Sequence, residues 1–356
     1  MLEPITIQSR NGSYEVSFIA SLLSNINAIM EGSPVFLVDA NIARLYAIPL
    51  ATVISNPTTI IIEATEENKS IERLIPVIER LVFNKIRRGN VLVAIGGGII
   101  QDITCFVATI LMRGVEWRFV PTTLLAQADS CIGSKSSINL GQIKNILGTF
   151  NSPGQIWICP EFLKTLEKKE IDSGIGEILK VHAIAGQEAF DNLKIDFYNL
   201  ASNRQLLLTY IRAALLIKQK YIEIDEFDIG IRNIFNYGHS FGHAIESASQ
   251  FAIPHGVAVS MGMDMANYIA AIRGHLSMEH FDRMHSVLMH NYQDFREIPI
   301  PLDSMLGALM KDKKNTATEL ILILPVGDVA EIKRIGIPPN ELFRNQCKLF
   351  IEAMQA

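Results

Sequence analysis

The sequence has few cysteines, and their arrangement excludes a disulfide-stabilised secreted fold. Only four of the 356 residues are cysteine, none in a CxxC pair, and three of them lie in apolar runs. We expect reduced core thiols and a cytoplasmic protein. The four residues are Cys105, Cys131, Cys159 and Cys347.

The chain also lacks a basic excess and long apolar runs. A net charge of −5 argues against nucleic acid or an anionic membrane as a partner. No apolar run is long enough to span a bilayer, and the N-terminus lacks the basic and apolar regions of a signal peptide. Because 49% of the residues are hydrophobic and the chain is long, we expect two compact domains.

Apolar, β-branched segments alternate with helical patterns through the first half of the chain. They predict a mostly parallel α/β sheet over residues 1–159, with strands in the segments 5–9, 34–39, 58–64, 90–96 and 117–121. Asp39 ends one such run, where an acidic residue either binds ribose hydroxyls or caps the next helix.

A triple-glycine turn follows the fourth strand. Gly96, Gly97 and Gly98 separate an apolar strand from a helical pattern, a geometry that brings backbone amides up to a pyrophosphate. Three glycines also suit a plain tight turn. The GxGxxG fingerprint is absent, so we predict dinucleotide binding without an ordinary Rossmann dehydrogenase.

Residues 126–150 gather small polar side chains around two lysines. We interpret this segment as a phosphate-binding loop, the alternative being a solvated surface loop. Its candidate ligands are Asp129, Lys135, Lys144 and Asn145. The hydroxyls of Thr122 and Thr123, just before it, could face the same cofactor.

The second half begins at Pro160 and follows a helical period, which predicts an all-α domain over residues 160–356. His239 and His243 would lie one turn apart on one helix face, which favours a zinc site over a closely packed helix contact. A catalytic zinc needs a third protein ligand and an open position. Glu177, three residues before Lys180, is the candidate, although such a pair is normally a surface ion pair.

Taken together, the motifs resemble the 3-dehydroquinate synthase family of sugar phosphate cyclases. The resemblance spans nearly the whole chain in order, through ENKS, GGGIIQD, VPTTLL, ADSCIGSKSSIN, KNILG, GEILK, GIRNIFNYGHSFGHAIE, HGVAVSMGM and DKK. It implies a Rossmann-like NAD-binding domain followed by a helical metal- and substrate-binding domain. It also implies a cytoplasmic homodimer that uses NAD and zinc or cobalt.

The activity implied is that of a carbon–oxygen lyase of the shikimate pathway, which leads to the aromatic amino acids. Such an enzyme cyclises 3-deoxy-D-arabino-heptulosonate 7-phosphate to 3-dehydroquinate and releases phosphate. The metal would acidify a ring hydroxyl, and NAD would take a hydride and later return it. The protein would mainly hold the reacting molecule in one conformation and exclude water from it.

The resemblance also assigns residues by position. It makes Glu177, His239 and His255 the metal ligands and moves His243 to the substrate phosphate. The cofactor set is Asp39, Glu66, Lys69, Gly96, Gly97, Gly98, Asp102, Thr122, Thr123 and Lys144. The substrate set is Lys180, Lys218 and Asp129 at the hydroxyls, Arg232 and Asn236 at the carboxylate, and Lys135, Asn145, His243, Lys314 and the other subunit's Arg113 at the phosphate.

Four positions depart from the family pattern. Val257 and Asp228 stand where glutamate is usual, and Gln101 and Ser134 stand where glycine is usual. The alternatives are therefore a sibling cyclase that makes valiolone or inosose products, a metal-dependent polyol dehydrogenase, or a non-catalytic member that only binds NAD or a sugar phosphate. Arg232 and Asn236 favour an acidic substrate, because sibling substrates carry no carboxylate.

Overall fold

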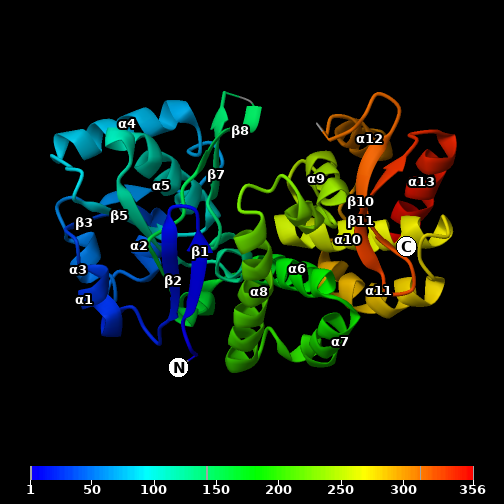
Figure 1. Ribbon diagram of the computed structural model, residues 1–356, viewed down its shortest axis with the longest axis horizontal. Helices are drawn as coiled ribbons and strands as arrows, with labels where there is room; N and C mark the ends of the chain where they lie inside the picture. Colours follow the sequence, from blue (N-terminus) through cyan, green and yellow to red (C-terminus); the bar gives the residue numbers. More distant parts are fainter. Residues whose placement is uncertain (1, 142, 313, 356) are drawn as a thin grey trace. The chain divides into compact units, whose positions relative to one another are not determined.

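The computed structural model describes residues 2–141, 143–312 and 314–355, so Lys313 of the DKK motif lies outside the described residues. The chain forms two compact units, shown as a ribbon in Figure 1. One comprises residues 1–166 and 218–229, and the other residues 167–217 and 230–356. The sequence prediction put the boundary at residue 159, whereas the first unit runs to residue 166 and includes a later segment.

The first unit is built on a seven-stranded sheet of order β1-β2-β9-β6-β5-β3-β4. Its first pair, β1–β2, is an antiparallel hairpin, and the other neighbours are parallel. This confirms the expected mostly parallel sheet. The strands are β1 (Ile5–Ser9), β2 (Gly12–Phe18), β3 (Pro34–Asp39), β4 (Ile60–Ile62), β5 (Val91–Gly96), β6 (Glu116–Pro121) and β9 (Gln155–Ile158).

Strand β5 is buried along its whole length, as a strand covered by helices on both faces must be. Helices α2 and α3 pack with β3 and β5 in one apolar core. Between β2 and β3, residues 20–31 contain only the short helices η1 and α1. The helices are η1 (Leu23–Asn25), α1 (Ile26–Ile29), α2 (Ala40–Leu45), α3 (Ala51–Ile54), α4 (Ile71–Phe83), α5 (Gly98–Ile110), η2 (Leu111–Arg113), η3 (Ala126–Ser130) and η4 (Pro160–Thr165).

The segment predicted to be a phosphate-binding loop is largely a second, smaller sheet. After the π-helical turn η3, strands β7 (Lys135–Leu140) and β8 (Ile143–Phe150) form an antiparallel hairpin. The loop prediction was wrong because polar residues such as Ser136 and Asn139 look like loop composition, while Ile138 and Leu147 pair with each other across the strands.

The second unit is mainly helical, as expected. Helix α10 is buried over most of its length and packs against α6, α9, α11 and α13, so it is the central helix of the unit. The helices are α6 (Lys168–Ala185), α7 (Gln187–Asp196), η5 (Phe197–Asn199), α8 (Arg204–Ile224), η6 (Ile231–Asn236), α9 (His239–Ala248), α10 (His255–Ile272), α11 (Met278–Tyr292), η7 (Gln293–Phe295), α12 (Leu302–Met310) and α13 (Glu341–Gln355). The residues of α8 from Lys218 onward belong to the first unit.

One hairpin departs from the expected all-α composition. Strands β10 (Leu320–Val326) and β11 (Glu331–Ile337) pair antiparallel, and β10 packs on α10. The turn uses Gly327 at φ 76°, a conformation that glycine adopts without strain. Among the described residues, no helix has both the length and the hydropathy needed to cross a membrane.

Candidate metal centre and active site

Three predicted cofactor-binding segments leave the parallel sheet at the same edge. Asp39 ends β3 and Gly96 ends β5, where it pairs with Pro121 at the end of β6. The Thr122 N–H donates to the Gly96 carbonyl over 2.9 Å. The sheet therefore gathers the glycines and the threonines at its carboxyl edge, the edge at which open α/β sheets bind ligands.

The glycine turn is closely packed. A Cβ on Gly97 would lie 2.9 Å from Thr123 Cγ2, and Gly97 is the N-cap of α5. The first N–H groups of α5 have no partner in their own helix and suit an anion. Asp39 does cap α2 by accepting the Asn41 N–H over 2.9 Å, so the capping alternative is correct and ribose binding stays a prediction.

A buried lysine connects predicted cofactor residues with a predicted phosphate ligand. The Lys69 Nζ lies 3.2 Å from Asp102 Oδ2 and 3.6 Å from Glu66 Oε1, and it donates to Asn145 Oδ1 over 2.8 Å. Burial raises the pKa of Asp102, although the Lys69 charge opposes this. Asn139, which the sequence analysis missed, donates to Glu66 Oε1 over 2.9 Å. Four predicted residues thus form one cluster.

Two further predicted lysines of the first unit bind carboxylates. The buried Lys218 Nζ lies 2.7 Å from Asp129 Oδ1, so this predicted pair is adjacent. Lys135 is exposed at the start of β7 and forms an ion pair with Asp228, one of the positions that depart from the family pattern. Both lysines therefore have a carboxylate that holds them in place.

In the second unit, three helices each supply one predicted metal ligand. Glu177 comes from α6, His239 begins α9 and His255 begins α10. The Glu177 Oε1 lies 3.2 Å from His255 Nε2 and 3.6 Å from His239 Nε2. A single divalent ion spans donor atoms at such separations. The predicted carboxylate and imidazoles therefore meet at one place.

The donor chemistry also fits a divalent metal. Glu177 is only 1% exposed, and neither of its oxygens has a hydrogen bond of normal geometry, so its charge is balanced by cations. Lys180 forms an ion pair with it. Two imidazoles and a glutamate are one of the ligand sets of catalytic zinc, which leaves a fourth position open.

His243 lies beside these ligands. The ligand nitrogens of His239, His243 and His255 lie within 4.8 Å of one another, and the first two rings are one helical turn apart with centroids at 5.3 Å. Two ligand sets are thus possible, and both contain His239 and His255. The resemblance favours Glu177 as the third ligand.

The protonation states of the centre follow from burial and charge. Burial raises the pKa of Glu177, but Lys180 and His255 outweigh it and hold that pKa well below its usual value. Burial lowers the pKa of His239, and the Lys180 charge adds to the effect. Burial also opposes charge on His255, yet Glu177 and Glu246 raise its pKa to about 10.

Glu246 is a functional candidate that the sequence analysis missed. Its Oε2 lies 3.1 Å from His255 Nδ1, which fixes that ring with Nε2 turned toward Glu177. Carboxylates commonly orient metal-binding histidines in this way. Its position, three residues after His243 and seven after His239 on α9, is the signal that could have identified it.

The remaining predicted residues of the second unit surround the ligands. The Lys180 Nζ lies 5.7 Å from the centroid of Phe235, in the η6 turn that also carries the buried Arg232 and the half-buried Asn236. Burial lowers the pKa of His243, and the charges of His255 and Lys314 add to this, so Lys314 is near the cluster.

Arg113 lies apart from the glycine turn within the first unit, whereas Lys144 directly precedes Asn145 of the Lys69 cluster. Helix α5 leads away from the glycine turn, so Arg113, which follows its C-terminus and precedes β6, lies at the opposite edge of the sheet. It is exposed, with φ 64°. Lys144 is exposed on β8.

Three of the departures from the family pattern lie at buried positions. Gln101 is buried and exchanges hydrogen bonds with Ser130, which follows Asp129. Val257 is fully buried in α10, and Glu246 rather than a residue beside the histidine holds His255. Ser134 is buried just before β7.

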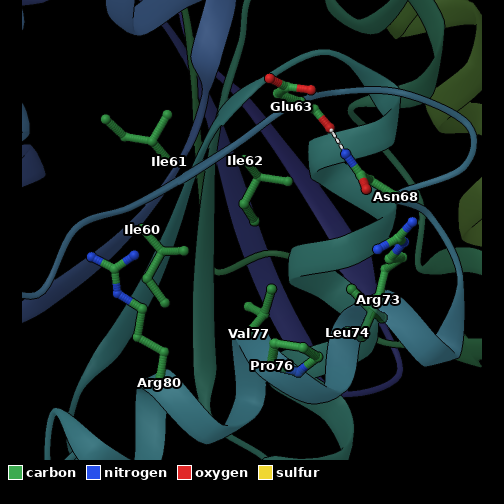
Figure 2. A pocket seen from close by; sticks show the side chains of 10 residues that line it. All are labelled: Ile60, Ile61, Ile62, Glu63, Asn68, Arg73, Leu74, Pro76, Val77 and Arg80. Carbon is green, nitrogen blue, oxygen red and sulfur yellow. Dashed lines mark hydrogen bonds between the residues drawn. The ribbon is translucent and has the colours of Figure 1, made fainter.

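A separate groove of about 360 Å³ lies between the edge strand β4 and helix α4 (Figure 2). Aliphatic side chains such as Ile60, Ile62 and Val77 line it, and the Asn68 side chain donates to the Glu63 carbonyl at its rim. None of the predicted site residues lines this groove. The charged clusters described above are therefore elsewhere.

Comparisons with known proteins cover most of the chain. Models of the 3-dehydroquinate synthase N-terminal and C-terminal regions match residues 59–173 and 174–315. The 3-dehydroquinate synthase of Alkaliphilus metalliredigens is 32% identical over 96% of this chain and 97% of its own length. That of Thermodesulfovibrio yellowstonii is 36% identical over 76% of each chain.

Solved structures share the fold. The 2-epi-5-epi-valiolone synthase of Streptomyces hygroscopicus, solved with NAD+ and Zn2+ bound, is 26% identical over 96% of each chain, with a TM-score of 0.81. A 2-deoxy-scyllo-inosose synthase complex superposes with a TM-score of 0.83 at 20% identity, covering 98% of this chain and all of its own. An iron-containing alcohol dehydrogenase of Thermotoga maritima shares the fold more distantly, at 15% identity over 95% of this chain and 97% of its own, with a TM-score of 0.65.

Proposed function

The chain belongs to the 3-dehydroquinate synthase family, and we propose that it cyclises 3-deoxy-D-arabino-heptulosonate 7-phosphate to 3-dehydroquinate with release of phosphate. Curated relatives with that activity match it at 32–36% identity over most of its length. It is a lyase of the shikimate pathway, dependent on NAD and a divalent metal.

The observation that carries the proposal is the convergence of Glu177, His239 and His255 from three helices. A zinc or cobalt ion bound there would supply Lewis acidity to a substrate hydroxyl. Glu177 is held ionised and His239 neutral, the states that ligands need, and a metal at His255 would replace the proton that Glu177 and Glu246 favour there. The metal is part of the proposal, supported by this donor set and by the zinc of the valiolone synthase.

We assign NAD to the first unit. The Gly96–Gly98 turn would receive the pyrophosphate at the N-terminus of α5, with Thr122 and Thr123 beside it. Asp39 would meet a ribose at the end of β3, and Lys69 would carry positive charge toward the same edge. Bound NAD would accept a hydride and return it, so no net oxidation would occur.

The substrate would be held by cations and amides of the remaining set. Arg232 offers a bidentate guanidinium for the carboxylate, next to Asn236 in the same turn. Lys180, paired with Glu177, can donate to a hydroxyl near the metal. Lys135, Asn145, His243 and Lys314 would bind the phosphate, and Lys218 with Asp129 would position the hydroxyls.

The assembly we propose is a cytoplasmic homodimer. Exposed apolar side chains gather on the β7–β8 hairpin and at the C-terminal end of α5, beside Arg113. They are Ile110, Met112, Leu140, Ile143, Ile146 and Phe150. Exposed apolar surface of this kind marks interaction sites, and a second copy would bring Arg113 to the phosphate. All four cysteines are free and buried, as suits a reducing compartment.

The substrate is tested by phosphate release. Purified protein with zinc or cobalt and NAD is expected to release phosphate from 3-deoxy-D-arabino-heptulosonate 7-phosphate. Sedoheptulose 7-phosphate and glucose 6-phosphate serve as the comparison substrates, because they lack the carboxylate that Arg232 would bind. Release from either of these, and none from the acid, would assign the chain to a sibling activity.

A further inference from the structure

Helices α6 and α10 touch through their backbones next to two of the metal ligands. A Cβ on Gly256 would lie 1.8 Å from the Ser173 carbonyl oxygen, and one on Gly176 would lie 2.0 Å from the Gly256 oxygen. Glu177 directly follows Gly176, and His255 directly precedes Gly256. The separation of the two ligands is therefore set by this backbone contact rather than by long side chains.

The first turn of α10 takes a hydrogen-bond acceptor from α6. Helix α10 begins at His255, and its N-cap, Pro254, makes no side-chain capping bond. The Gly256 N–H belongs to the first turn and has no acceptor within its own helix. Ser173 Oγ accepts this N–H over 2.9 Å. Ser173 thus caps a helix other than its own, one turn before Glu177.

A buried asparagine from α11 holds the same two helices. The Asn291 Nδ2 donates to the Asp172 carbonyl of α6 over 3.1 Å and to Ser260 Oγ of α10 over 2.9 Å. Ser260 Oγ in turn donates to the Gly256 carbonyl over 3.1 Å. Asn291 is 4% exposed, so these bonds are not in competition with bulk water.

From this geometry we infer that Ser173 is a positioning residue for the metal centre, acting through the Gly256 N–H on His255. The inference rests on the proposed metal at Glu177, His239 and His255. Loss of the cap frees the first turn of α10, and His255 is the ligand on that turn. Ser260 and Asn291 support the same contact from its other side.

The test compares Ser173→Ala with Ser277→Ala. Ser277 caps α11 by accepting the His280 N–H over 3.2 Å, so the control loses a bond of the same kind in the same unit without touching α6 or α10. Both variants are expected to lower the melting temperature of the apo-protein by a few degrees. Zinc affinity, measured by competition with a chromogenic chelator, is expected to fall about tenfold in Ser173→Ala only.

The visible absorption of the cobalt-loaded protein provides a readout of ligand geometry that is independent of turnover. Its band positions are expected to shift in Ser173→Ala and to stay unchanged in Ser277→Ala. Ser260→Ala, which places a good helix former in α10, is expected to shift them in the same direction and covers the case in which Ser173→Ala does not fold. Unchanged zinc affinity and unchanged cobalt spectra in Ser173→Ala and Ser260→Ala would overturn the inference. Absence of metal binding by the wild-type protein would instead overturn the proposed function.

Discussion

At the scale of single residues, the metal centre depends on one buried carboxylate and its charged neighbours. Glu177 is enclosed by Lys180 and two imidazoles. A carboxylate buried in this way would destabilise the fold without positive charge beside it. Glu177 precedes both histidines by more than sixty residues in the sequence, so only the fold brings the ligand atoms together. The role of Glu177 as a metal ligand can be tested directly.

Glu177→Gln keeps the shape of the side chain and removes its charge. We expect zinc affinity to fall by at least about a hundredfold, because an amide is a poor metal ligand and no longer offsets the positive charge of Lys180 beside the metal. Calorimetric titration of the apo-protein measures this. Glu188→Gln, an exposed glutamate on α7, is the control and should bind zinc normally. Equal affinity in the two variants would favour the three-histidine ligand set.

His280 on α11 gives the stability of the protein a pH dependence. Burial, and then the Arg283 charge, lower its pKa to about 4, below the ordinary value of 6.5. The unfolded chain therefore binds the proton more readily, and the stability present above pH 6.5 is lost as the pH falls toward 4. Relative to His280→Gln, the wild type should lose about 1–2 kcal/mol more over this range, less than the full shift because of screening. Urea unfolding at a series of pH values measures the free energy of unfolding of both proteins. The same dependence on pH in the wild type and in His280→Gln would contradict the prediction.

At the scale of elements, the carboxyl edge of the sheet and the starts of α9 and α10 carry the chemistry. The GHSFGH segment at residues 238–243 allowed two interpretations, a metal site or a close helix contact, and the structure contains the geometry of both. A Cβ on Gly262 of α10 would lie 2.0 Å from the Gly238 oxygen just before α9. Close approach of these helices is what brings His239 near His255.

The glycine turn offers an element-level test of the cofactor assignment. Gly97→Ala adds a Cβ within 2.9 Å of Thr123 where the pyrophosphate would pass, so we expect the dissociation constant for NAD to rise about tenfold. Gly89→Ala is the matched control, since a Cβ there meets nothing within 4 Å. Fluorescence titration measures both constants. Unchanged NAD binding in Gly97→Ala would show that the pyrophosphate does not bind at this turn.

The apolar runs predicted the central strands and most of the long helices because burial imposes a period on them. The β7–β8 hairpin was missed, since its residues alternate in a segment rich in serine and asparagine. Histidine spacing on α9 predicted the cluster of imidazoles. The Ser173 cap and the Glu246 contact could not be predicted from residue spacing, because each depends on which helices pack together.

At the scale of the whole molecule, the position of Arg113 connects the site to assembly. It lies at the opposite edge of its own sheet from the glycine turn, and we propose that it acts at the phosphate of a second copy. The exposed apolar side chains of the β7–β8 hairpin are the surface on which we expect that copy to bind.

Subunit mixing tests this assembly. Arg113→Ala and His255→Gln homodimers should each be nearly inactive. If Arg113 acts on the neighbouring subunit, a mixed dimer has one intact site, and random mixing should restore about a quarter of wild-type activity. Activity is followed by phosphate release after exchange of subunits in dilute denaturant. No recovery, with mixed dimers demonstrated by mass spectrometry, would place Arg113 in its own subunit's site, and an active Arg113→Ala homodimer would place it outside catalysis.

We propose that the protein eliminates phosphate while its NAD takes a hydride and returns it, so that it does not act as a dehydrogenase. Phosphate and NADH measured together in one reaction, with 3-deoxy-D-arabino-heptulosonate 7-phosphate, catalytic NAD and zinc, test it most directly. We predict many phosphates released per protein chain while no NADH accumulates. Accumulation of NADH in step with substrate loss, without phosphate, would contradict the account.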